Sequence, residues 1–171
     1  MAKVAKILNE DITVEFFKQI EKEHPYRSVT TEYKRELDYI AYPTDFFTQH
    51  EVRSALKKCG AEIIVYYMFI RERMGSQQEA YFIDITADKG LQFIEDVKYY
   101  LGFNDEQIKR FTKVLTQEGL IKELYIDERR ILTAAHQIWN FLTCDNKRIA
   151  SRESSARYLA KQKAEQENNS S

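Results

Sequence analysis

Polar side chains that could contact a nucleic acid gather on one predicted helix, between residues 104 and 118. They are Gln107, Lys109, Arg110, Lys113 and Gln117. The apolar residues of the same stretch recur at the three- and four-residue spacing of a buried helix face. The helix would therefore turn its basic residues to solvent, where they can bind phosphates, while a glutamine can hydrogen-bond to a base edge.

An ordinary solvated helix surface is the alternative interpretation of this stretch. Asp105 and Glu106 open the predicted helix and place negative charge where a phosphate would approach. The residue types alone leave both interpretations open.

Two arginines, Arg129 and Arg130, follow Glu128 at the tip of a predicted two-stranded ribbon. Arginines at such a position can reach phosphates or enter a narrow minor groove. Short ribbons also carry charge simply to stay soluble. We expect a functional contact for Arg129 in particular.

The strongest local charge lies near the end of the chain. Between Lys147 and Lys163 there are six basic residues and one acidic residue, a net charge of +5. Lys147, Arg148 and Arg152 begin this stretch, and each phosphate contact they made would release counterions. A solvated helix, or a helix that packs on a second copy of the protein, would have the same composition.

Catalytic chemistry finds little support in the sequence. The three histidines, His24, His50 and His136, are far apart and fit no metal-binding motif. Glycine-rich phosphate-binding loops are absent, and Cys59 and Cys144 belong to no Cys/His cluster. We therefore expect no enzymatic activity, no cofactor and no metal.

The sequence predicts the order helix, turn, helix and ribbon for the elements that position the basic residues. A helix predicted from Leu91 ends at Gly102, Asn104 with Gln107 forms a capping-box pattern, and Gly119 ends the second helix. Two strands meeting at a turn at Asp127-Glu128 follow, and residues 81–85 predict a third strand. This order is typical of a mostly α (α+β) winged helix-turn-helix with a small antiparallel sheet.

Further elements are expected on both sides. A helix should run from Asp11 to His24. Residues 36–42 favour a strand, with the end of a helix as the alternative, and Pro43 closes either element. Thr48 and Glu51 suggest a capped helix reaching Gly75, which Gly60 either interrupts or adapts for close packing. Residues 134–144 predict another helix, and residues 167–171 are expected to be disordered.

These patterns divide the chain of 171 residues into three parts. We expect an N-terminal helical extension (1–40), a winged-helix domain (41–145) and a basic, partly disordered C-terminal tail or helix (146–171). The net charge of −1 means that nucleic-acid binding would come from a local patch. Neither a signal peptide nor an apolar run of about 20 residues is present, so we expect a cytoplasmic protein without membrane contact.

Short motifs between Tyr42 and Arg152 resemble those of one family. They are YPTDFF at 42–47, Val52 to Leu56 with Gly60-Ala61, residues 64–67, FNDE at 103–106 with GLI at 119–121, and Lys147-Arg148 with Arg152. The chain resembles the DnaD-like N-terminal winged-helix domain of phage replisome organisers and replication-initiation proteins. It departs from the family at Cys59 and Ile63, residues 1–40 are not explained by it, and the long C-terminal domain of larger relatives is not seen.

The resemblance implies a non-enzymatic protein that binds double-stranded DNA in the replication initiation of a phage or plasmid. Homo-oligomers and contacts with replication proteins are compatible with that role. A transcriptional regulator with the same fold is one alternative. The other is a protein-interaction or oligomerisation module without DNA binding, which the near-neutral charge and the acidic pair Asp105-Glu106 favour.

Overall fold

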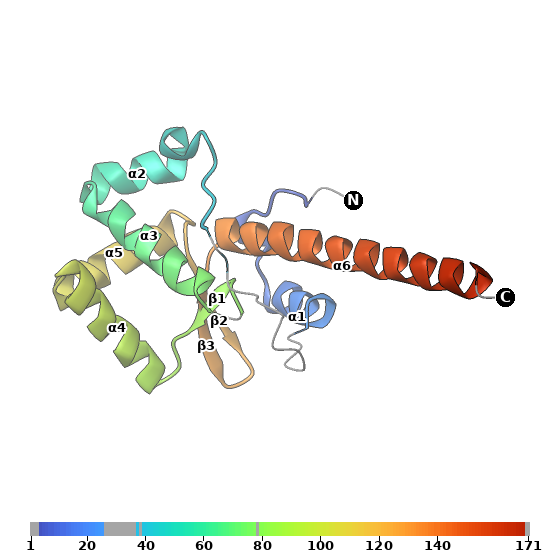
Figure 1. Cartoon of the computed structure of the whole chain (residues 1–171). Helices are drawn as coiled ribbons and strands as arrows, with labels where there is room; N and C mark the ends of the chain where they lie inside the picture. The colour runs from blue at the N-terminus through green and yellow to red at the C-terminus, as the bar shows by residue number, and fades with distance from the viewer. Residues whose placement is uncertain (1–3, 26–36, 38, 78, 170–171) are drawn as a thin grey trace.

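The protein is mostly helical and contains a small three-stranded sheet (Figure 1). The computed structural model describes residues 4–25, 37, 39–77 and 79–169. Its helices are α1 (Val14–Glu23), α2 (His50–Cys59), α3 (Glu62–Gly75), α4 (Asp88–Leu101), α5 (Asp105–Gln117) and α6 (Ala135–Asn169). Short 3-10 turns occupy Asn9–Asp11 and Phe46–Thr48, and the strands are β1 (Phe82–Asp84), β2 (Lys122–Ile126) and β3 (Arg129–Thr133).

Strand β3 lies in the middle of an antiparallel sheet with the order β1-β3-β2. Leu132 pairs with Ile83 of β1 on one side and with Glu123 of β2 on the other. The turn that joins β2 to β3 places Asp127 at a φ of 54°, a left-handed conformation that aspartate tolerates better than most residues. The predicted ribbon and its third strand are confirmed.

The sheet separates two hydrophobic cores because neighbouring strand residues point to opposite faces. Leu132 and Ile83 join the core under helices α2 to α5. Ile131 and Phe82 join the second core, to which α1 and the start of α6 contribute Phe17 and Phe141, among others. The strands therefore hold the two groups of helices in one body.

The connection between α4 and α5 follows the predicted signals. Gly102 ends α4 with a φ of 70°. The Asn104 side chain accepts a hydrogen bond from the Gln107 amide (2.9 Å), and the Gln107 side chain accepts one from the Asn104 amide (3.0 Å). Gly119, with a φ of 74°, stands just beyond the end of α5. Both ends of α5 are thus fixed by local sequence.

The predicted cap at Thr48 is wrong. Phe46 is buried and holds residues 46–48 in a 3-10 turn, in which the Thr48 hydroxyl donates to the Asp45 carbonyl at 2.9 Å. The N-cap of α2 is therefore Gln49, one residue later than predicted, and the helix begins at His50. Gly60, at a φ of 75°, interrupts the run, so α2 and α3 are separate helices.

The predicted strand at residues 36–42 is also wrong where the structure describes it. Glu36 and Asp38 lie outside the described residues, and Tyr39 to Tyr42 form irregular chain. This segment packs on the end of α3 instead of a sheet edge. The Leu37 amide donates to the Gly75 carbonyl at 2.8 Å, and a Cβ on Gly75 would lie 2.5 Å from Ile40 Cδ1.

Helix α6 runs without interruption through residue 145, where we expected the domain to give way to a tail. Asp145 is buried, and its carboxylate lies 2.7 Å from His24 Nδ1 at the end of α1. Beyond residue 150 the helix projects from the body with all its described side chains exposed (Figure 1). The expected disorder is wrong for residues 167–169, which continue the helix; residues 170 and 171 lie outside the description.

Helices α3 and α6 meet around a buried charge. Arg71 is fully buried, donates from Nε to the Gln137 side chain at 3.1 Å and lies over the Tyr42 ring. Next to it, the Tyr67 hydroxyl lies 3.2 Å from His136 Nδ1. Burial, and then the positive charge of Arg71, lower the pKa of His136 to about 4. The imidazole is therefore neutral in the folded protein near neutral pH.

The lowered pKa of His136 predicts a loss of stability in acid. Between the unfolded value near 6.5 and the folded value near 4, the unfolded chain binds more protons, so stability falls as the pH falls. From about pH 7 to about pH 4.5 this residue should remove about 2 kcal/mol of unfolding free energy, after allowance for its partial exposure. Urea unfolding of the native protein and of His136→Gln at several pH values measures this loss. If the unfolding free energy of both proteins falls equally with pH, His136 is not its cause.

The capping box of α5 predicts a second effect. Asn104→Ala should lower the free energy of unfolding by about 1 kcal/mol, because it leaves an amide at the start of α5 without its acceptor. Asn104→Ser keeps an acceptor oxygen and should stay within a few tenths of a kcal/mol of the native value. Equal losses in the two variants would show that the cap does not stabilise the helix.

Candidate nucleic-acid interface

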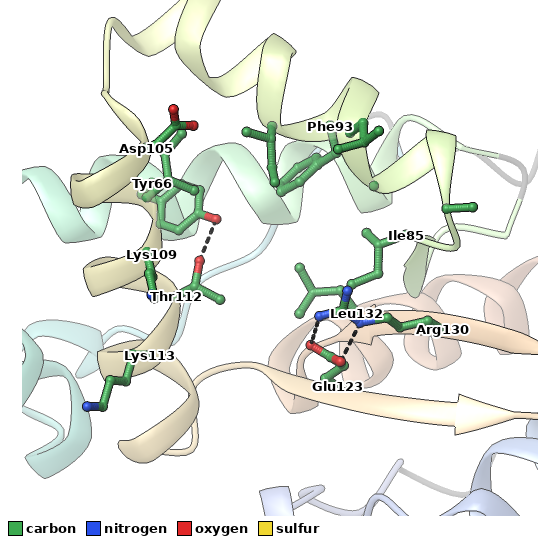
Figure 2. A pocket seen from close by; sticks show the side chains of 15 residues that line it. Tyr66, Ile85, Phe93, Asp105, Lys109, Thr112, Lys113, Glu123, Arg130 and Leu132 are labelled. Carbon is green, nitrogen blue, oxygen red and sulfur yellow. Dashed lines mark hydrogen bonds and ion pairs between the residues drawn. The ribbon is translucent and has the colours of Figure 1, made fainter.

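The exposed face of α5 carries three of the predicted residues. Lys109, Lys113 and Gln117 follow one another at intervals of four and are all exposed. Figure 2 shows Lys109 and Lys113 on the same side of α5, one turn apart. Among the described residues, neither ammonium group has an ion pair or hydrogen bond. These two charges are therefore available to an external partner.

The start of α5 is less acidic than its sequence suggests. Asp105 pairs with Lys98 at the end of α4 at 2.8 Å, and Lys98 also pairs with Glu95 at 3.0 Å. The hydrogen bond from Lys98 to Asp105, followed by that to Glu95, raises the pKa of Lys98. Glu106 remains exposed, and the Gln107 side chain is engaged in the capping box. The Oε1 atom of Gln107 therefore stabilises the start of α5.

Arg110 lies on another side of α5 and contacts α2. Its Nη2 donates to the Lys58 carbonyl at 2.7 Å, near the negative end of the α2 dipole. Close by, the Glu118 carboxylate accepts hydrogen bonds from Lys58 and from Ser54. The Lys58 bond, and then the Ser54 bond, lower the pKa of Glu118. The structure therefore joins Arg110 to the α2–α5 contact and not to the Lys109–Lys113 face.

The two arginines of the ribbon point to opposite faces of the sheet because they are neighbours in β3. Arg130 binds both oxygens of Glu123 on β2, at 2.5 and 3.0 Å. Arg129 faces α1 and pairs with Glu21 at 3.0 Å. The hydrogen bond that Arg130 donates to Glu123 raises the pKa of Arg130, and the one that Arg129 donates to Glu21 raises the pKa of Arg129. Both charges are thus compensated within the chain.

Sequence reasoning missed both acidic partners of these arginines. The partner Glu123 could have been predicted, because the predicted ribbon places it diagonally across from Arg130 on the same face, where opposite charges attract. Glu21 precedes Arg129 by 108 residues in the sequence, and only the packing of α1 on the sheet brings the two together. No local pattern signals that second pair.

The basic residues of α6 form a separate set. Lys147 and Arg152 are exposed and Arg148 is half-buried. Helix α6 extends away from the side of the molecule that holds α4 and α5 (Figure 1). Residues 147–163 carry +5 in a chain whose net charge is −1, so the rest of the chain carries −6. The structure does not bring these residues together with Lys109 and Lys113.

A groove with a volume of about 590 Å³ lies between α4, α5 and the sheet (Figure 2). Its walls are mainly apolar and include Leu91, Ile94, Ile108 and Leu132, with the Tyr66 ring of α3 beside them. The Tyr66 hydroxyl lies 2.9 Å from Thr112 Oγ1. Sequence reasoning missed this groove, because its apolar residues have the helical spacing of ordinary core positions.

Metal sites and membrane-spanning helices are not found in the part of the chain that is described. There, no group of three or more His, Cys, Asp or Glu side chains is placed to hold a metal ion. None of the helices described is long and apolar enough to cross a membrane. Comparison with known proteins yields no neighbour: no family model matches the chain, and no curated protein or solved structure is significantly similar to it.

The contact between α1 and the ribbon predicts a measurable coupling. A double-mutant cycle of Glu21→Ala and Arg129→Ala should give a coupling energy of about 0.5 kcal/mol in urea unfolding, since both side chains are about one-third exposed. The more exposed pair of Lys18 and Asp127, at 3.4 Å, is the matched control and should couple more weakly. A larger coupling in the control pair would contradict this ranking.

Proposed function

We propose that this chain is a non-enzymatic winged-helix protein that binds double-stranded DNA through the exposed face of α5. The observation that carries the proposal is the placement of Lys109 and Lys113, which have no partner among the described residues, on the helix directly before the ribbon. In a winged helix the corresponding helix enters the major groove. The element order α3-β1-α4-α5-β2-β3 and the sheet order β1-β3-β2 support this fold.

The role in replication initiation of a phage or plasmid rests on the resemblance between residues 42 and 152 and the DnaD-like domain. It includes a cytoplasmic location, and contacts with other replication proteins are compatible with it. A transcriptional regulator would use the same α5 surface. A footprint on an origin or on a promoter distinguishes the two roles.

The proposed DNA interface contains fewer residues than the sequence predicted. Lys109 and Lys113 would bind phosphates, and Gln117 is exposed one turn further along α5. Arg129 and Arg130 are excluded from the proposed interface by their pairing with Glu21 and Glu123. The +5 segment of α6 would reach a second stretch of DNA, because it extends in another direction.

A protein-interaction module is the second candidate. The groove beside α5 favours it, because an apolar surface at this place suits a protein better than a phosphate backbone. The −6 charge outside residues 147–163 also opposes DNA, except where local positive charge prevails.

Binding of double-stranded DNA, measured by fluorescence anisotropy over a salt series, tests the α5 interface. Lys109→Ala with Lys113→Ala should weaken binding about tenfold and lower the slope of log affinity against log salt by about two, because two phosphate contacts are lost. Arg53→Ala with Lys57→Ala is the matched control, since it removes two exposed cations at the same spacing from α2.

Three outcomes of this experiment are informative. A loss confined to the α5 variant supports the proposal. Equal losses in both double variants would indicate non-specific attraction and contradict an interface on α5. Absence of binding by the native protein at low salt would contradict DNA binding and favour the protein-interaction module.

A further inference from the structure

We propose that the groove between α4, α5 and the sheet binds a small amphipathic anion, an apolar body with one carboxylate or sulfonate. We further propose that such a ligand competes with DNA for α5. The competition rests on the proposed function, whereas the ligand site does not. Figure 2 shows the groove, with α5 along one wall and the strands along another.

The groove offers an apolar surface to the apolar body of the ligand. Helix α4 contributes Leu91, Phe93 and Ile94, α5 contributes Ile108, and Leu132 projects from β3. Leu91 is 64 % exposed, so burial of this side chain by a ligand would be favourable. The volume of about 590 Å³ falls within the range of pockets for small ligands.

The charges around the groove select an anion. Five charged side chains line it: Asp105, Lys109, Lys113, Glu123 and Arg130. Asp105 is paired with Lys98 outside the groove, and Glu123 is paired with Arg130. The two remaining charges, Lys109 and Lys113, are both positive. A ligand of opposite charge would compensate them, whereas a cation would be repelled.

A polar pair beside the apolar residues could orient such a ligand. The Tyr66 hydroxyl and Thr112 Oγ1 lie 2.9 Å apart on the α5 side of the groove. Burial raises the pKa of Tyr66, so its hydroxyl keeps its proton and can donate to a ligand oxygen. This pair adds a hydrogen-bonding group close to Lys109.

Competition with DNA follows from the shared lysines. A ligand that pairs with Lys109 and Lys113 withdraws both ammonium groups from phosphates and adds negative charge beside α5. The ligand and DNA should then weaken each other's binding by the same factor, as thermodynamic linkage requires.

Two fluorescent probes test the site in the absence of DNA. 1-Anilinonaphthalene-8-sulfonate carries the proposed combination of aromatic rings and an anionic group, and N-phenyl-1-naphthylamine has the same rings without the charge. We expect one sulfonate probe per chain, bound about tenfold more tightly than the neutral probe, since each exposed lysine contributes on the order of a threefold effect. Lys109→Gln with Lys113→Gln should remove that preference.

A variant at the rim separates this groove from other apolar surfaces. Leu91→Glu adds a negative charge at an exposed groove position and should weaken sulfonate binding at least fivefold. Tyr99→Glu makes the same change on an exposed residue of α4 outside the groove and should leave binding unchanged. The proposed site is overturned if both probes bind with equal affinity. It is also overturned if Leu91→Glu and Tyr99→Glu weaken binding of the sulfonate probe equally.

Decanoate extends the test to a soluble carboxylate. Displacement of the sulfonate probe by decanoate supports the site. If the protein instead binds phosphatidylglycerol vesicles and decanoate does not displace the probe, the proposal of a small soluble ligand is overturned. Decanoate should also weaken DNA binding by the native protein. If the native protein binds the probe as expected but no DNA, the ligand site stands and the proposed function fails.

Discussion

Strand β3 imposes the constraint on which both halves of the molecule depend. Its side chains alternate, so Leu132 closes the core under α2 to α5 while Ile131 closes the core beneath α1 and α6. The same alternation directs Arg130 toward the groove and Arg129 toward α1. A shift of one residue in register would exchange these faces. The strand thus determines which surface each neighbouring element can present.

Internal ion pairing then determines where external charge is available. The ribbon arginines are compensated by Glu21 and Glu123, and Arg110 contacts the end of α2. Positive charge that remains on the α5 side comes from Lys109 and Lys113, beside apolar walls. A phosphate backbone and an amphipathic anion can each use these two lysines, but only the anion also uses the apolar walls.

Local patterns predicted the parts of the fold that local interactions determine. The capping box at Asn104 and the ribbon turn depend on neighbours within a few residues, and both were predicted. The same capping pattern at Thr48 failed, because burial of Phe46 favours a different turn there. Exposure of the α5 lysines followed from helical spacing, whereas the Glu21–Arg129 pair required contacts between distant segments that no short pattern contains.

The continuity of α6 has a consequence for the entropy of binding. Its basic side chains are held on one helix of 35 residues, about 52 Å long at the usual rise per residue, instead of on a flexible tail. A preformed helix loses less backbone entropy on binding than a disordered segment does. It also fixes the distance of each charge from the body. A molecule that bound α6 through these residues would therefore need charges at matching distances.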